Sequence, residues 1–187
     1  DQDGSPVMGM VTRLVGHKGL DLVRSVAEGL LQQGIQLVIL GSGEHGYEAF
    51  FNDLAYRHPG RVGVYIGFNA TLAQQIYAGS DIFLMPSKSE PCGLSQMVAC
   101  RYGAVPVVRE TGGLKDSIQD SGDGQGNGFT FANYSAHDLY QACWRAKEGY
   151  WQEGWMTLVK RAMSCDFGWD VSAKSYAQMY KQVVNLW

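Results

Sequence analysis

The chain has 187 residues, and its 15 Lys or Arg against 18 Asp or Glu give a formal net charge of −3. This length suits one domain with a sizeable hydrophobic core, and the charge balance argues against binding nucleic acid through a basic face. The longest apolar stretches are strand-sized, so we expect no membrane span. The chain begins at Asp1 without a visible signal peptide, and we expect a fragment or a processed product.

Strands and helices are predicted to alternate through the first 108 residues. The predicted strands are Val7–Thr12, Gln36–Leu40, Val62–Ile66, Ile82–Met85 and Val105–Val108, and the helices between them are Gly19–Gln33, Tyr47–Arg57, Thr71–Tyr77 and Gly93–Tyr102. Repeated strand–helix units of this length favour right-handed crossovers. We therefore predict an α/β fold, with a Rossmann-like parallel sheet and helices on both of its faces.

The rest of the chain is predicted to be mainly a helical tail. Residues 119–127 are rich in Gly and Asp and predict a flexible surface loop, and Gly128–Phe131 predicts a last short strand. Helices are then expected over Ser135–Tyr150, Trp155–Met163 and Val171–Leu186, with Ser135 and Ser172 as N-caps.

Two loops that follow predicted strands can serve a nucleotide. Arg13 and Lys18 flank the first, and two cations at a helix N-terminus suit a diphosphate, although ordinary surface charges are the alternative. Gly41 and Ser42 begin a Gly-Ser-Gly turn that lacks the full dinucleotide fingerprint, so a nucleotide site and a plain turn both stay open. Phe68 follows the third strand and either stacks on a nucleobase or belongs to the core.

Glu90 stands before Pro91 and close to the predicted helix start at Gly93, which holds it in an extended conformation. A carboxylate there can accept hydrogen bonds from sugar hydroxyls, act as a nucleophile or general base, or simply be a helix N-terminal acid. Cys92 has no His or Asn partner placed for it, which argues against a nucleophilic thiol.

Neither the cysteines nor the histidines are spaced like metal ligands. The four cysteines show no CxxC spacing and are expected to be reduced thiols, and the four histidines form no metal-spaced set. We therefore predict no metal site and no cofactor.

Four motifs together carry a family resemblance over nearly the whole chain. They are Arg13-x4-Lys18-Gly19-Leu20, Pro86-Ser87-x2-Glu90-Pro91-Cys92-Gly93-Leu94, Thr111-Gly112-Gly113-Leu114-x-Asp116 and Met163-Ser164-x-Asp166-Phe167-x-Trp169. In these motifs the chain resembles bacterial glycogen synthases and plant starch synthases, which are glycosyltransferase family 5 enzymes with the GT-B fold. The resemblance implies the carboxyl-terminal half of a two-domain enzyme whose active site lies in the cleft between its halves.

The resemblance also implies roles for individual residues. Arg13, Lys18 and Glu90 would be catalytic: the two cations would hold the diphosphate, and Glu90 would face the glucosyl unit. The backbone around Cys92, Gly93 and Leu94 would grip the sugar hydroxyls, and Thr111, Gly112 and Gly113 would cap the distal phosphate. Phe68 would lie against the base. Gly41 and Ser42 are expected at the nucleotide site from their turn alone, and not from the resemblance.

In this reading residues 1–168 bind the nucleotide sugar, and residues 169–187 form a crossover helix toward the absent amino-terminal half. That half would supply most of the α-glucan acceptor surface. The last helix carries an apolar stripe of Tyr176, Met179, Tyr180 and Val183, and its aromatic members Tyr176 and Tyr180 would then be partly exposed here or buried in a neighbouring chain. The expected chemistry is retaining α-1,4 glucosyl transfer from ADP-glucose or UDP-glucose, with ADP-glucose favoured, and this chain alone is expected to be inactive.

One position departs from the wider GT-B pattern, because Val98 stands where many retaining relatives carry a second glutamate. Two alternatives stay open: another retaining GT-B transferase, and a stand-alone nucleotide-binding module. The expected location is the cytoplasm of a bacterium, or a plastid if the source is a plant.

Overall fold

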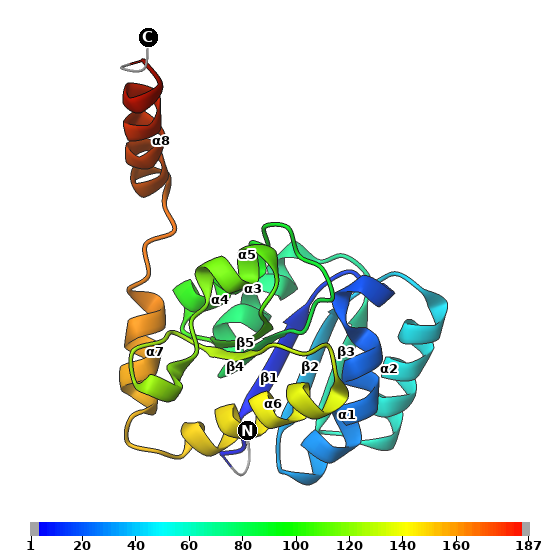
Figure 1. Ribbon diagram of the computed structural model, residues 1–187. Coiled ribbons are helices and arrows are strands. Elements are labelled where there is room, and N and C mark those ends of the chain that lie inside the picture. The colour runs from blue at the N-terminus through cyan, green and yellow to red at the C-terminus, as the bar shows by residue number, and fades with distance from the viewer. Residues whose placement is uncertain (1–3, 185–187) are drawn as a thin grey trace.

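A computed structural model describes residues 4–184 and contains one parallel sheet of six strands (Figure 1). In chain order the strands are β1 (Val7–Val11), β2 (Gln36–Gly41), β3 (Val62–Ile66), β4 (Ile82–Met85), β5 (Val105–Arg109) and β6 (Phe129–Phe131). Their order across the sheet is β3-β2-β1-β4-β5-β6, and every pairing is parallel. The predicted Rossmann-like fold is confirmed.

Successive strands are added on one side of β1 as far as β3, and on its other side from β4 onward. Strands β1 and β4 are therefore neighbours, although 70 residues of chain separate them. In open parallel sheets, ligands bind outside the carboxyl ends of the strands at the point where the strand order reverses in this way. The loops after β1 and β4 carry Arg13, Lys18 and Glu90. The topology therefore brings the first and fourth loops of the chain to one edge.

Helices cover both faces of the sheet, as predicted. They are α1 (Leu20–Gln32), α2 (His45–Arg57), α3 (Ala70–Gly79), α4 (Ser95–Tyr102), α5 (Gly112–Ser117), α6 (Ala136–Tyr150), α7 (Trp155–Met163) and α8 (Trp169–Val184). The main core lies between the sheet and α1, α6 and α7, and a second cluster lies under α3 and α4. Short 3-10 turns occur at Gly16–Lys18 and Ser121–Asp123.

The helix boundaries follow local chemistry. The predicted apolar face of α1 is buried, with Leu20, Val23, Ala27, Leu30 and Leu31 in the core. Ser135 caps α6 as predicted, because its side chain accepts a hydrogen bond from the Asp138 N–H at 3.1 Å. Such a cap contributes about 0.5–2 kcal/mol.

The predicted N-cap at Ser172 is wrong. Helix α8 already begins at Trp169, so Ser172 lies inside its first turn. Just before the helix, the Asp166 carboxylate accepts a hydrogen bond from the Gly168 N–H at 2.8 Å. The predicted helix end at Leu186 lies outside the described residues.

The Gly- and Asp-rich segment 119–127 is tied down at both ends. Asp120 accepts hydrogen bonds from the N–H groups of Gly122 and Thr130. Asn127 accepts from the Gln119 N–H and donates to the Ser117 carbonyl. The segment is therefore a loop, as predicted, but its acidic and amide side chains hold it to the domain.

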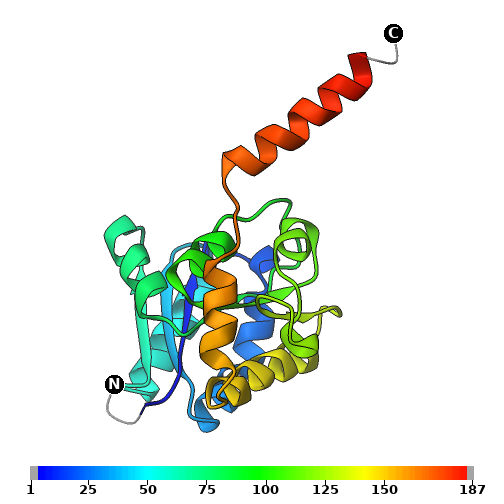
Figure 2. The same cartoon turned by 90° about the vertical axis from the view of Figure 1, so that its left-hand side faces the viewer.

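Helix α8 extends away from the sheet after an extended segment, residues 164–168 (Figures 1 and 2). None of its described residues is buried. Tyr176 and Tyr180 are 52% and 61% exposed, and their rings lie 6.2 Å apart. In both views α8 lies beyond the side of the sheet toward which β1 runs.

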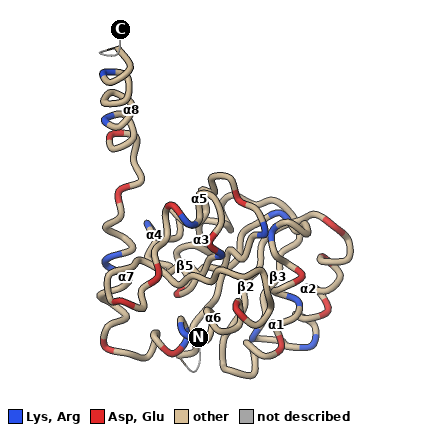
Figure 3. The backbone as a smooth tube through the Cα atoms, in the orientation of Figure 1, with Lys and Arg blue, Asp and Glu red and all other residues tan. Residues whose placement is uncertain are grey.

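Charged residues of both signs are interspersed along the fold (Figure 3). Within residues 4–184, no helix is both long enough and apolar enough to cross a membrane.

Candidate functional site

The centre of the candidate site is an ion pair between Lys18 and Glu90. The Lys18 Nζ lies 2.5 Å from the Glu90 Oε2, and the two side chains are 17% and 10% exposed. The buried Ser87 hydroxyl donates to the same carboxylate oxygen at 3.2 Å. Loss of either charged partner would leave an uncompensated charge in a largely desolvated position.

A cavity of about 360 Å³ opens beside this pair. Its walls include Thr12, Arg13, Lys18, Met85, Glu90, Gly93 and Leu94. The Arg13 side chain is exposed, and its Nη2 lies 3.4 Å from the His17 Nε2. The cavity therefore combines two cations, one carboxylate and the backbone of the turn before α4, which suits an anionic group joined to a polyhydroxyl one.

A second cavity of about 240 Å³ shares Val11, Thr12 and Arg13 with the first. Its other walls include Gly41, Ser42, Phe68 and Asn69. Phe68 is 92% exposed, which excludes the alternative that it belongs to the core. Because Arg13 stands where the two cavities adjoin, the predicted base-binding and diphosphate-binding residues form one continuous surface.

At two positions of the site, a neighbouring backbone carbonyl lies so close that only glycine fits. A Cβ on Gly41 would lie 1.9 Å from the Thr12 carbonyl oxygen, which keeps the end of β2 against the loop after β1. A Cβ on Gly113 would lie 1.8 Å from the Cys92 carbonyl oxygen. Substitution at either position would displace a loop of the site.

The motif of residues 111–113 packs directly against the loop that carries Glu90. The Gly113 N–H donates to the carbonyls of Glu90 and Pro91 at 3.1 and 3.2 Å. Gly112 has a φ of +44° and approaches the Glu90 carbonyl closely. This N–H of Gly113 is thus engaged within the protein, and the predicted contact of Thr111, Gly112 and Gly113 with a phosphate stays a prediction.

Sequence reasoning missed three supporting residues of the site. Ser87 contacts Glu90, and the fully buried Gln96 donates to the carbonyls of Cys92 and Gly93 at 3.3 and 2.9 Å. Arg109, at the end of β5, holds two carbonyls of the Glu90 loop. A polar residue inside an apolar pattern was the available signal for Gln96, whereas Arg109 offered none.

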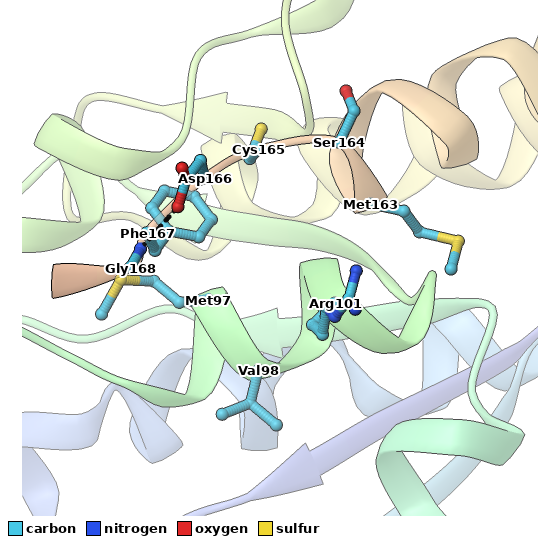
Figure 4. Close-up of a pocket in the computed structure, with 9 residues that line it drawn as sticks. All are labelled: Met97, Val98, Arg101, Met163, Ser164, Cys165, Asp166, Phe167 and Gly168. Carbon is cyan, nitrogen blue, oxygen red and sulfur yellow. Dashed lines mark hydrogen bonds between the residues drawn. The ribbon is translucent and has the colours of Figure 1, made fainter. Parts of the chain in front are cut away.

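A cavity of about 560 Å³, larger than the two at the candidate site, lies elsewhere (Figure 4). It is bounded by Met97, Val98 and Arg101 of α4 and by Met163 to Gly168. It shares no lining residue with the two cavities of the candidate site. Val98 lines this cavity rather than the one at Glu90.

The cysteines differ in their environments. Burial raises the pKa of the Cys100 and Cys143 thiols to about 12, so both stay protonated at neutral pH. Cys92 is exposed beside the site, and its Sγ lies 3.7 Å from the Gly93 carbonyl oxygen. In the part of the chain that the structure describes, no three His, Cys, Asp or Glu side chains gather as a metal site would need.

Comparisons with known proteins show the family to which the chain belongs. The model of the family described as glycosyl transferases group 1 matches residues 1–149. The glycogen synthase of Bacillus anthracis is 50% identical over 188 residues, covering 99% of this chain and 40% of that protein. The glycogen synthase of Anoxybacillus flavithermus is 50% identical over 186 residues, covering 98% of this chain and 38% of that protein.

Among solved structures, the catalytic domain of starch synthase IV from Arabidopsis thaliana, bound to ADP and acarbose, superimposes with a TM-score of 0.88. It is 38% identical, and the match covers 97% of this chain and 39% of that one. The chain thus spans about 40% of the length of these relatives. The resemblance to glycogen and starch synthases is confirmed, and the chain belongs to the glycosyl transferases group 1 family.

Proposed function

We propose that this chain is the donor-binding half of a glycogen or starch synthase. The full-length protein would transfer glucose, with retention, from a nucleoside diphosphate glucose to the non-reducing end of an α-1,4-glucan. The observation that carries the proposal is the Lys18–Glu90 pair, which stands beside Arg13 and next to a cavity edged by the exposed Phe68. The order of groups along this surface matches the order base, diphosphate, sugar.

The described side chains suggest how the donor would be held. Phe68 offers an exposed ring face for the base, and Arg13 and Lys18 offer charge-assisted hydrogen bonds to the diphosphate. A diphosphate would give the Lys18 ammonium a second anionic partner, leaving Glu90 to accept hydrogen bonds from the glucosyl hydroxyls. In this proposal Glu90 orients the sugar, and no metal or other cofactor takes part.

The exposed stripe of α8 supports the second part of the proposal, that a further half of the protein completes the site. Tyr176, Met179, Tyr180 and Val183 are each 45% to 61% exposed. Exposed apolar patches of this kind commonly mark an interface. An amino-terminal half that covers the stripe would bring the acceptor glucan over the sheet edge at Glu90. A bacterial cytoplasm, or a plant plastid, is the proposed location.

Isothermal titration tests donor binding directly. ADP, UDP, ADP-glucose and UDP-glucose are titrated into this chain, with Glu90→Gln as the variant. We expect saturable binding of a nucleoside diphosphate, and ADP-glucose is expected to bind more tightly than UDP-glucose. Glu90→Gln should lower the affinity for ADP-glucose more than the affinity for ADP. Binding of none of the four ligands by the folded chain would contradict the proposal.

The same titration separates the alternatives. A stand-alone nucleotide-binding module would bind ADP and ADP-glucose with equal affinity, and Glu90→Gln would change neither affinity. A fifth ligand, a nucleotide sugar that carries a hexose other than glucose, tests the other alternative, because a different retaining transferase would bind it more tightly than both glucose esters.

A further inference from the structure

Arg109 joins two loops that are distant in sequence. At the end of β5 its Nε donates to the Ser87 carbonyl at 3.0 Å, and its Nη2 donates to the Lys88 carbonyl at 2.7 Å. Its Nη1 donates to the Ala132 carbonyl, just after β6, at 3.2 Å. One guanidinium thus ties the loop that carries Glu90 to the segment between β6 and α6.

Tyr134 continues this connection toward α1. The Arg109 guanidinium carbon lies 5.6 Å from the centroid of its ring, and the Lys88 Nζ lies 5.5 Å from it, so both cations can interact with the ring. The Tyr134 hydroxyl donates to the Asp21 Oδ1 at 2.5 Å. Asp21 belongs to the first turn of α1, three residues after Lys18.

The two ends of this connection also touch through their backbones. The Lys88 N–H donates to the His17 carbonyl at 2.9 Å. Gly19 has a φ of +77°, and a Cβ there would lie 2.1 Å from the Pro86 carbonyl oxygen. The turn that carries Lys18 therefore packs directly on the loop that carries Glu90, and the Arg109–Tyr134–Asp21 chain spans the same two segments from the side.

We propose that Arg109 and Tyr134 are positioning residues, which hold the loop of residues 86–92 against the N-terminal turn of α1 so that Lys18 and Glu90 meet. The effect of these two residues on donor binding rests on the proposed function, whereas their role in holding the two segments together does not. Lys18 and Glu90 are 72 residues apart in the chain, and their contact is short. A displacement of about 1 Å at such a site is enough to impair catalysis strongly.

We call the connected side chains of Arg109, Tyr134 and Asp21 the brace, and their chemistry explains why these residue types occur there. A guanidinium offers five donors in a rigid planar fork, so Arg can hold three carbonyls at once, whereas Lys offers a single point of charge. Burial, together with the hydrogen bond to Asp21, raises the pKa of Tyr134, so its hydroxyl stays a neutral donor at ordinary pH. The Asp21 carboxylate is the acceptor at the far end.

Amide hydrogen exchange tests the brace on this chain without any ligand. Tyr134→Phe removes only the hydroxyl, and Arg109→Lys removes the fork. In each variant we expect the Lys88 amide to exchange roughly tenfold faster, because one supporting hydrogen bond or more is lost. Asp21→Asn keeps an acceptor oxygen and should preserve the protection that Asp21→Ala loses.

Tyr140→Phe is the matched control. Tyr140 packs against the core from α6, and its hydroxyl has no hydrogen bond among the residues that the structure describes. Its replacement should leave the exchange of the Lys88 amide unchanged. Unaltered Lys88 exchange in both Tyr134→Phe and Arg109→Lys would overturn the brace.

A titration with ADP-glucose and ADP gives the second readout. If Arg109 and Tyr134 position Glu90, Tyr134→Phe should weaken the binding of ADP-glucose roughly tenfold, and that of ADP less, at a temperature where the variant is fully folded. Faster Lys88 exchange with unchanged affinities for both ligands would overturn the positioning role. Faster exchange in a chain that binds no nucleotide sugar even as wild type would support the brace and contradict the proposed function instead.

Discussion

At the scale of single residues, the two cations of the site differ in their surroundings. Arg13 is exposed, and its Nη2 lies 3.4 Å from the His17 Nε2, whereas Lys18 is mostly buried against Glu90. The same substitution at the two positions should therefore have different consequences for stability, even if both side chains contact one diphosphate.

Arg13→Ala is expected to weaken the binding of ADP much more than the binding of adenosine, and to leave the melting temperature nearly unchanged. Lys18→Ala should weaken ADP binding in the same selective way and also destabilise the fold, because Glu90 loses its ion-pair partner in a largely desolvated position. Calorimetric titration and thermal unfolding measure the two effects. Arg101→Ala, an exposed cation on α4 at the other cavity, is the control. Equal losses for ADP and adenosine would rule out the diphosphate role.

Phe68→Ala is expected to lower ADP affinity by about 1–3 kcal/mol, the usual contribution of one stacked base. Folding should be almost unaffected, because the ring is 92% exposed. The control is Tyr56→Ala, which removes another highly exposed aromatic ring outside the cavity. Unchanged ADP affinity in a fully folded Phe68→Ala chain would show that the ring does not contact the base.

At the scale of elements, Asp120 anchors the loop before β6. It accepts hydrogen bonds from the N–H groups of Gly122 and Thr130, and it pairs with both terminal nitrogens of Arg145. Burial by itself raises the pKa of Asp120, but the hydrogen bonds from Arg145, Thr130 and Gly122 outweigh it and lower this pKa to about 2.

Since the pKa is lowered on folding, the ionised Asp120 stabilises the domain fully above its ordinary value of 3.8 and loses this effect as the pH falls through about 2. Asp120→Asn should therefore be less stable than wild type at neutral pH. The difference between the two should shrink across that acidic window. Urea unfolding of both proteins over a pH series measures it. A difference that stays constant down to the lowest pH would contradict this assignment.

Most elements could be predicted because local signals agree with tertiary packing. Strand β3 has its predicted bounds, and α1 differs by one residue at each end, since apolar periodicity and glycine punctuation coincide there. Helix α5 was not predicted, because its first two residues are glycines, which have low helix propensity. Its position is set by contact with the Glu90 loop.

The candidate site was predictable only in part. Arg13, Lys18, Glu90 and the Gly-Ser turn follow strands, so the sheet topology brings them to one edge. Their pairings were not predictable, since the Lys18–Glu90 contact joins residues 72 apart and Arg109 acts through carbonyl groups that no sequence pattern marks. Long-range polar contacts of this kind depend on the finished fold.

At the scale of the whole molecule, the proposed function makes this chain one side of a cleft. Its candidate-site residues lie at the carboxyl edge of the sheet, and α8 extends beyond that side (Figures 1 and 2), with its apolar stripe exposed. Glucosyl transfer needs an acceptor held against the sugar in a closed site. The chain also spans about 40% of the length of its glycogen synthase relatives.

The measurement that tests this account most directly compares this chain with the full-length protein in one assay. ADP release from ADP-glucose is followed in the presence of glycogen, at equal molar concentrations of the two proteins. The account predicts that the full-length protein elongates glycogen, while this chain releases no ADP above the hydrolysis background. Robust glucan elongation by this chain alone would contradict the half-site, and an inactive full-length protein that is folded would contradict the synthase assignment.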